Sequence, residues 1–237
     1  FQDTQQRWNS TSRMLTVLAV CHYGTLQIDR FHERTGDKCL VNGHYYSEKA
    51  PLPTLLTIPF YYLVKSPGDL VNDEKGLIGK RAYIVGNIIC SSLPFVFILS
   101  LLFLKLQKEK VAISPVLLAT LPFYGSFIFL YTGAFLNHLF SAALLLTAYV
   151  FLKDKKKFFL SGVFAGLAFL SDFPLGIALP VWALQIYFNR KSFKNSLEFV
   201  LGFLPSVLFI FAYNYFITGN PFKMLYRYHP RALLYSF

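Results

Sequence analysis

The chain has 237 residues, of which 54% are hydrophobic, 18% aromatic and only 15% charged. This composition excludes a disordered chain and argues against an ordinary soluble domain. Lysine and arginine number 23 against 12 aspartates and glutamates, a formal net charge of +11, which in so apolar a chain favours basic cytoplasmic loops over nucleic-acid binding.

Residues 1–81 form a polar head that contains eight of the 12 acidic and ten of the 23 basic residues. Its apolar stretch, 51–64, has only 14 residues and includes three prolines. Because a membrane crossing needs about 20 apolar residues, this stretch predicts an interfacial or re-entrant helix instead of a span.

Four long stretches after the head contain almost no ionisable group and predict a membrane body. The two longest have 42 residues (111–152) and 32 residues (158–189), so each must fold back on itself. We expect the first to turn between Tyr131 and His138 and the second at Ser171–Pro174, since proline disfavours helix. The fold class is therefore all-α: a polytopic helical membrane protein with a bundle over 82–217, a tail over 218–237 and about six spans, at 82–105, 111–134, 138–152, 158–171, 174–189 and 197–217.

Three short loops between these spans contain ten basic residues, whereas the opposite turns contain none. The loops are 105–110, 153–157 and 190–194. The positive-inside rule places them in the cytoplasm, so that the head, the turns near Asn137 and Asp172 and the tail face the other side. A head on that side needs an export signal, and the chain starts at Phe1 without one, so we expect a preceding helix to be missing.

Candidate chemistry lies in the head. A carboxylate such as Asp29 or Glu48 can take a proton from an attacking hydroxyl, and the Lys49 ammonium can hold a phosphate. Each also has a purely structural alternative. Asp29 could serve simply to pair with Arg30 or Arg34 or to cap a turn. Glu48 could serve simply as a salt-bridge partner of Lys49, and Lys49 could simply extend to lipid headgroups.

Further candidates lie on the same predicted face. Asn137, His138 and Asp172 lie at turns, where helix capping is the alternative to a catalytic or binding role. The sequence around Asp37 predicts that it is a turn residue. The sequence shows no metal-ligand spacing, phosphate-binding glycine loop or nucleotide fingerprint. No cofactor or metal site is therefore predicted, although a divalent metal stays an open alternative.

Four segments occur in a characteristic order: Ile28–Asp29; Tyr45–Leu52, similar to Glu-Lys-Pro-Pro-Leu; Phe135–His138; and Gly166–Pro174, similar to Gly-Leu-Ala-x-Leu-Thr-Lys-Gly-Pro. The chain thereby resembles the C-type (GT-C) membrane glycosyltransferases, in particular bacterial relatives of the protein O-mannosyltransferases and of the lipid A aminoarabinose transferase. Members of that family begin with an earlier helix and continue with further spans, so the chain resembles a fragment.

The resemblance implies an inverting transfer of a hexosyl or pentosyl group from a polyprenyl-phosphate sugar to a lipid, glycan or protein acceptor, on the outer face of the bacterial inner membrane. By position, Asp29 would be the general base, Lys49 would neutralise the departing phosphate, and Glu48 would orient Lys49 or bind the sugar. Further substrate-binding candidates are Tyr46, Asn137, Asp172, Arg227 and Arg231.

Two departures from the family pattern qualify these roles. Asn137 stands where many members have aspartate, so a catalytic duty at that turn passes to His138 or is absent. Asp172 stands near the family's lysine and reverses its charge. Arg227 and Arg231 could contact phosphate or only anchor the tail at the interface.

Two other functions stay open on the sequence alone. One is a transporter or flippase-like protein for a lipid or polyisoprenoid, and the other is a non-catalytic membrane subunit. A transporter favours charged or broken helices near the membrane midplane and related halves. Here the polar groups gather at one face and no internal repeat is evident, which favours the enzyme.

Overall fold

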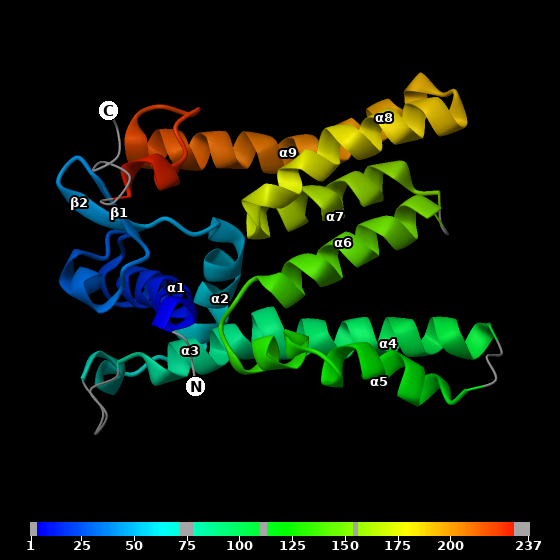
Figure 1. Ribbon diagram of the computed structural model, residues 1–237. Helices are drawn as coiled ribbons and strands as arrows, with labels where there is room; N and C mark the ends of the chain where they lie inside the picture. Colours follow the sequence, from blue (N-terminus) through cyan, green and yellow to red (C-terminus); the bar gives the residue numbers. More distant parts are fainter. Residues whose placement is uncertain (1–3, 72–77, 110–112, 154–155, 230–237) are drawn as a thin grey trace.

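The computed structural model describes residues 4–71, 78–109, 113–153 and 156–229. They form a small head at one end of a bundle of long helices (Figure 1). This arrangement confirms the predicted all-α class. The exception is a small β-hairpin in the head, which the sequence did not predict.

The head begins with helix α1 (Thr4–Tyr23), the 3₁₀ helix η1 (Asp29–Arg34) and the antiparallel strands β1 (Lys38–Val41) and β2 (His44–Ser47). Asn42 and Gly43 both have positive φ, as the two-residue turn of a tight hairpin requires. Helix α2 (Pro51–Val64) and the 3₁₀ helix η2 (Pro67–Leu70) complete the head. Helix α2 covers the stretch in which we expected a helix, and it runs across the direction of the long helices (Figure 1).

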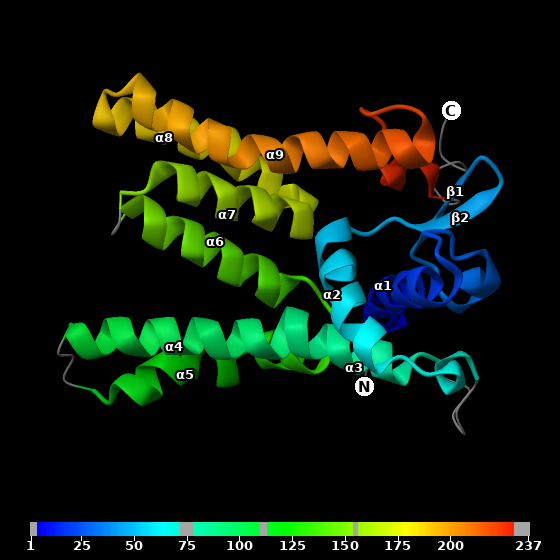
Figure 2. The same cartoon turned by 180° about the vertical axis from the view of Figure 1, so that it is seen from behind.

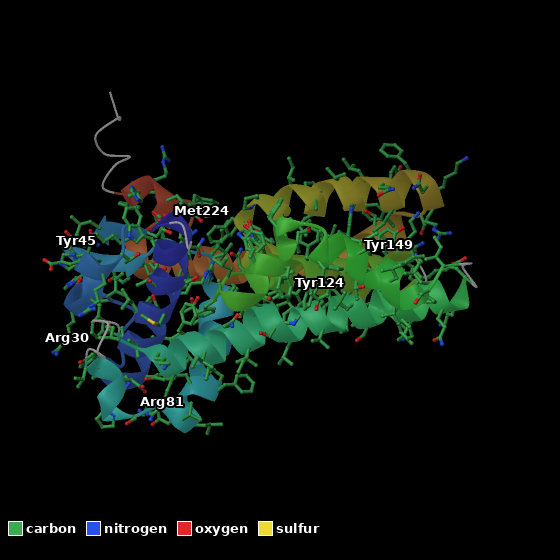
Figure 3. The ribbon with its side chains drawn as sticks, turned by 60° about the horizontal axis from the view of Figure 1, so that its bottom comes forward. Arg30, Tyr45, Arg81, Tyr124, Tyr149 and Met224 are labelled. Atoms are coloured by element: carbon green, nitrogen blue, oxygen red, sulfur yellow. The ribbon has the colours of Figure 1, made fainter. Side chains whose placement is uncertain are left out.

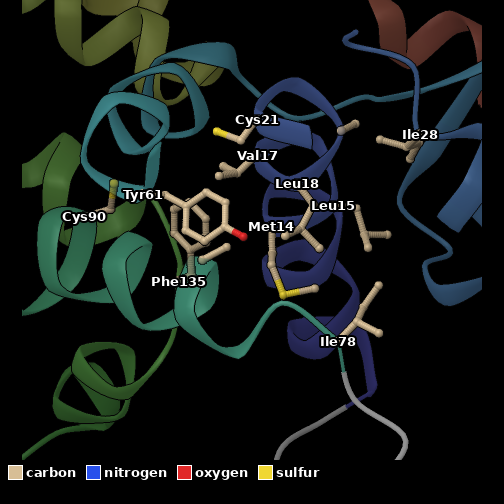
Figure 4. Packing of buried hydrophobic residues seen from close by; sticks show 12 residues of the cluster. Met14, Leu15, Val17, Leu18, Cys21, Ile28, Tyr61, Ile78, Cys90 and Phe135 are labelled. Atoms are coloured by element: carbon tan, nitrogen blue, oxygen red, sulfur yellow. The ribbon is translucent and has the colours of Figure 1, made fainter. Parts of the chain in front are cut away.

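The hydrophobic core of the head lies between α1, α2 and the start of the bundle. Met14 and Leu18 of α1 pack toward Tyr61 of α2, and Phe135 enters from the turn before α6 (Figure 4). Tyr61 is fully buried, and its hydroxyl donates to Asp69 at 2.8 Å. The core therefore joins the head to the bundle as one packed unit.

The bundle consists of three antiparallel helix hairpins. The first combines a continuous helix, made of α3 (Lys80–Asn87), the π-helical turn η3 (Ile88–Ser92) and α4 (Leu93–Lys108), with α5 (Pro115–Tyr124) and the 3₁₀ helix η4 (Phe127–Gly133). The second is α6 (His138–Lys153) with α7 (Phe158–Ser171). The third is α8 (Ala178–Arg190) with α9 (Phe193–Thr218), preceded by η5 (Phe173–Ile177) and followed by η6 (Leu225–Tyr228).

Helices α7 and α9 approach each other closely because glycines face each other. A Cβ atom added to Gly162 would collide with the carbonyl oxygen of Phe199, and one added to Gly202 would collide with that of Phe159. Small residues at facing positions let two helix backbones come together, as in many membrane bundles.

Both predicted turns are confirmed. The chain leaves η4 at Gly133 and starts α6 at His138, and α7 ends at Ser171 before Pro174. An additional break was not predicted: α5 and η4 are bent by 81°. Ser126 causes it locally, because its backbone is extended and its Oγ accepts from the N–H of Ile128, which starts a new helix.

The count of six spans is not confirmed. Within the described chain two helices are long and apolar enough to cross a membrane, Lys80–Lys108 and Phe193–Thr218, and the bent pair α5 and η4 would be a third if it forms one span. Helices α6 and α7 are apolar but shorter, with 16 and 14 residues.

The helix ends that flank the three basic loops lie together, at the end of the bundle away from the head (Figures 1 and 2). Residues 110 and 154–155 of those loops lie outside the described part. Figure 3 shows the same two ends of the molecule, with Arg30 and Tyr45 in the head and Tyr149 of α6 toward the opposite end. The head, the starts of α6 and α8 and the tail thus share one end.

Candidate active site

The segment between β2 and α2 carries Glu48 and Lys49. Pro51 and Pro53 occupy the first turn of α2, and a proline forces the residue before it into an extended conformation, as Ala50 shows with φ −52° and ψ 133°. The segment therefore runs extended past α1. There Ser47 Oγ lies 2.7 Å from Ser12 Oγ, and the carbonyl oxygen of Ala50 accepts a hydrogen bond from Arg13.

The ammonium group of Lys49 lies between two carboxylates. Its Nζ is 2.9 Å from Asp37 Oδ2 and 3.1 Å from Glu48 Oε1, and its side chain is only 12% exposed. Burial opposes the charge, but the hydrogen bond with Asp37 and the charges of Glu48 and Asp37 outweigh it and raise the pKa of Lys49. Lys49 therefore stays protonated and is fixed by the two carboxylates. It is not extended toward lipid headgroups, as the structural alternative required.

Glu48 is a buried carboxylate with one oxygen in use. Burial raises the pKa of its carboxyl, although the neighbouring Lys49 partly offsets this. Its Oε2 has no hydrogen-bond partner within the described chain, and His229 Nε2 lies 3.9 Å from it. A buried polar atom without a partner is costly, so this oxygen is suited to receive a hydrogen bond from a ligand.

Asp37 owes its position to a turn that is tied to α1. Its backbone N–H donates to Thr35 Oγ1 at 3.1 Å, and its carbonyl oxygen accepts from Ser12 Oγ at 2.6 Å. The turn predicted at Asp37 is present. Its carboxylate has a further role that the sequence did not indicate, because it is the shortest contact of Lys49.

Arg13 lies beside this group and is 2% exposed. Its Nε donates to Asn9 Oδ1 at 3.1 Å, Nη1 to the Ala50 carbonyl at 3.0 Å and Nη2 to Asn137 Oδ1 at 3.0 Å. Asn137 in turn donates to the carbonyl of Ser171 at 2.9 Å. One chain of hydrogen bonds thus joins α1, the lysine segment, the start of α6 and the end of α7.

His138 and Asp172 meet across the same helix ends. His138 Nδ1 lies 3.5 Å from Asp172 Oδ2, and the His138 ring packs edge-on against Tyr131. Asp172 makes no side-chain capping bond, so the capping alternative for it is not found. The tail closes this side, because the Tyr226 ring lies 5.8 Å from Lys49 Nζ and 5.9 Å from the Phe173 ring.

Asp29 lies in a different part of the head. Its Oδ1 accepts from the backbone N–H of Tyr45 at 2.6 Å and its Oδ2 lies 2.7 Å from His44 Nδ1, with the side chain 37% exposed. These contacts hold it at the start of β2, whereas Lys49 follows the end of that strand. The structure brings Glu48 and Lys49 together and sets Asp29 apart from them.

The other predicted residues are spread around this centre. The hydroxyl of Tyr46 accepts from Gln27 at 3.3 Å, and its ring packs with the cluster of Cys39 and Ile217. Arg227 is exposed in η6, and Arg231 lies outside the described residues. In the described ranges no three histidines, cysteines or carboxylates gather as metal ligands.

Sequence reasoning missed Arg13, Asp37 and Tyr226 as members of the site. A signal was present for Arg13, because a cation stands directly before the apolar run Met14–Val20 of a helix, where burial is expected. No signal was present for Tyr226, whose contacts depend on how the tail folds back.

Comparison with known proteins gives one match. Residues 77–215, more than half of the chain, match the model of a family described as dolichyl-phosphate-mannose-protein mannosyltransferase. No curated protein and no solved structure matches the chain. The matched range covers the helical bundle and leaves out most of the head.

Proposed function

The chain belongs to the dolichyl-phosphate-mannose-protein mannosyltransferase family, and on that premise we propose that it transfers a sugar from a polyprenyl-phosphate donor to an acceptor hydroxyl with inversion at the anomeric carbon. Membership makes the chain a membrane glycosyltransferase of the mannosyltransferase type. The donor, the stereochemistry and the catalytic residues are the proposal. The observation that carries it is the buried Lys49 held by Asp37 and Glu48 where the head meets the bundle.

The chemistry needs few protein groups, because a sugar phosphate is already activated. The acceptor oxygen forms a bond to the anomeric carbon while the bond to the phosphate oxygen breaks, and that electron pair stays on the departing polyprenyl phosphate. Lys49 stabilises the charge that grows on the phosphate, and this cation acts strongly because its surroundings are partly dehydrated.

The acceptor proton goes to a carboxylate of the head, and we assign this role to Asp29. Its side chain is accessible, and His44 lies close enough to orient it and to take part in proton transfer. Glu48 Oε2 is assigned to a sugar hydroxyl, since a donor group there satisfies the unpartnered buried oxygen. The acceptor is a lipid, a glycan or a protein.

We further propose that the head faces outward across the bacterial inner membrane. The support is the separation of charge, with the basic helix ends far from the head. Cysteine labelling in intact cells tests this. The Gly133→Cys variant is expected to react with an impermeant maleimide, because position 133 is exposed and has room for a side chain, whereas Lys156→Cys is expected to react only after permeabilisation. Equal labelling of both from outside refutes the orientation.

The donor is tested with purified protein in nanodiscs. We expect transfer from a polyprenyl-phosphate sugar and none from the matching nucleotide sugar, with the anomeric configuration of the product inverted relative to the donor. Heat-inactivated protein is the control. A product with retained configuration contradicts the single-displacement mechanism. Movement of the lipid across the membrane without any sugar transfer would support the transporter instead.

A further inference from the structure

Arg13 is a fully buried cation whose direct partners are all neutral. Its three hydrogen bonds go to the oxygens of Asn9, Ala50 and Asn137, and within the described chain no carboxylate forms an ion pair with it. An arginine has five N–H groups, so two of those of Arg13 have no acceptor among the described residues. Burial lowers the pKa of the guanidinium to about 10, which still leaves it charged at neutral pH.

Burying a charge away from a counter-ion is unfavourable, and neutral hydrogen bonds offset only part of this cost. Two carboxylates, Asp172 and Asp37, act on Arg13 through their charge. Each of them already forms a closer pair, Asp37 with Lys49 and Asp172 with His138. The fold thus maintains a positive charge that no carboxylate of the described residues contacts directly.

The balance of charge at the candidate site gives this cation a role. Asp37 and Glu48 together carry two negative charges against the single positive charge of Lys49. Without a further cation this group would repel an anionic ligand. Arg13 is joined to this group through the carbonyl of Ala50, the residue after Lys49. Its positive charge brings the net charge of the group to zero.

We propose that Arg13 is a positioning residue for the phosphate of the donor: it fixes the Lys49 segment against α6 and supplies the buried charge that lets this site accept an anion. The inference rests on the proposed function, because it concerns the same phosphate. Arg13 acts through the field of its charge and through the segment that it holds, without needing contact with the ligand.

Binding of a polyprenyl phosphate, compared with the uncharged polyprenol of equal length, tests this in nanodiscs. Arg13→Gln is expected to weaken phosphate binding by roughly tenfold or more and to leave polyprenol binding unchanged. Arg13→Lys keeps the charge but cannot reach all three acceptors of the guanidinium, so its phosphate binding is expected to lie between that of Arg13→Gln and that of wild type. A folded Arg13→Gln variant that still prefers the phosphate as strongly as wild type overturns the proposal.

A second pair of variants covers the case in which Arg13→Gln does not fold. Asn137→Asp and Asn137→Ser both remove the bond to Ser171, but only the aspartate sets a negative charge against the guanidinium. We expect Asn137→Asp to bind polyprenyl phosphate at least about fivefold more weakly than Asn137→Ser. Equal binding by the two contradicts the role of the charge. If the wild-type protein itself does not prefer the phosphate to the polyprenol, the proposed function fails.

Discussion

Lys49→Ala is expected to lower kcat for sugar transfer by about 10²–10³-fold, the usual cost of removing one group that stabilises transition-state charge. The reason is geometric. The Lys49 side chain is only 12% exposed, and two carboxylates fix its Nζ, so water is a poor substitute for it as a partner of the departing phosphate. Removing it also leaves Asp37 and Glu48 as two adjacent negative charges. The measurement is single-turnover transfer with saturating polyprenyl-phosphate sugar.

Lys65→Ala is the matched control. Lys65 follows the C-terminal end of α2 as Lys49 precedes its start, and its Nζ donates to the carbonyl of Cys21 and lies 3.9 Å from the centre of the Tyr62 ring. It therefore has the same charge and is likewise half-buried, but it lacks the two carboxylates. We expect transfer by Lys65→Ala to stay within about threefold of wild type. Near-normal turnover in Lys49→Ala would contradict the proposed role of Lys49 in stabilising the departing phosphate.

Features that depend on local sequence were predictable. Helix α2 has the expected bounds because two prolines start it and an extended Lys65 before Ser66-Pro67 ends it. The turn after Ser171 follows from Pro174 in the same way. The pairing of Glu48 with Lys49 needed no tertiary information, since the two are adjacent in the chain.

Features that depend on how segments meet were not predictable. Arg13 and Asn137 are 124 positions apart, and their bond exists only because α1 packs beside the start of α6. The hairpin β1–β2 is different, because it was missed although a local signal was present. Asn42-Gly43 is a typical two-residue hairpin turn, and the strands on either side contain Leu40–Val41 and Tyr45–Tyr46. The sequence around Asp37 predicts a turn, but it does not show that the Asp37 carboxylate contacts a lysine.

Two aspartates of the head can now be separated by experiment, because they occupy different surroundings. Asp29 is accessible and paired with His44, whereas Asp37 is tied to Lys49. Asp29→Asn is expected to lower kcat by about 10²–10⁴-fold, the range for loss of a general base, since asparagine keeps the size and can accept the Tyr45 N–H but cannot take a proton. The measurement is kcat over a range of pH.

Asp37→Asn supplies the comparison. It removes one of two carboxylates from Lys49 and leaves Glu48, so the lysine keeps a partner. We expect a fall in kcat of about tenfold or less, because the ammonium is less well fixed but still charged. The opposite order, with Asp29→Asn near wild type and Asp37→Asn almost inactive, moves the proton acceptor to Asp37. That result would place base and phosphate partner in direct contact, so the acceptor hydroxyl would have to approach from the side of the Thr35–Asp37 turn rather than from the exposed end of β2.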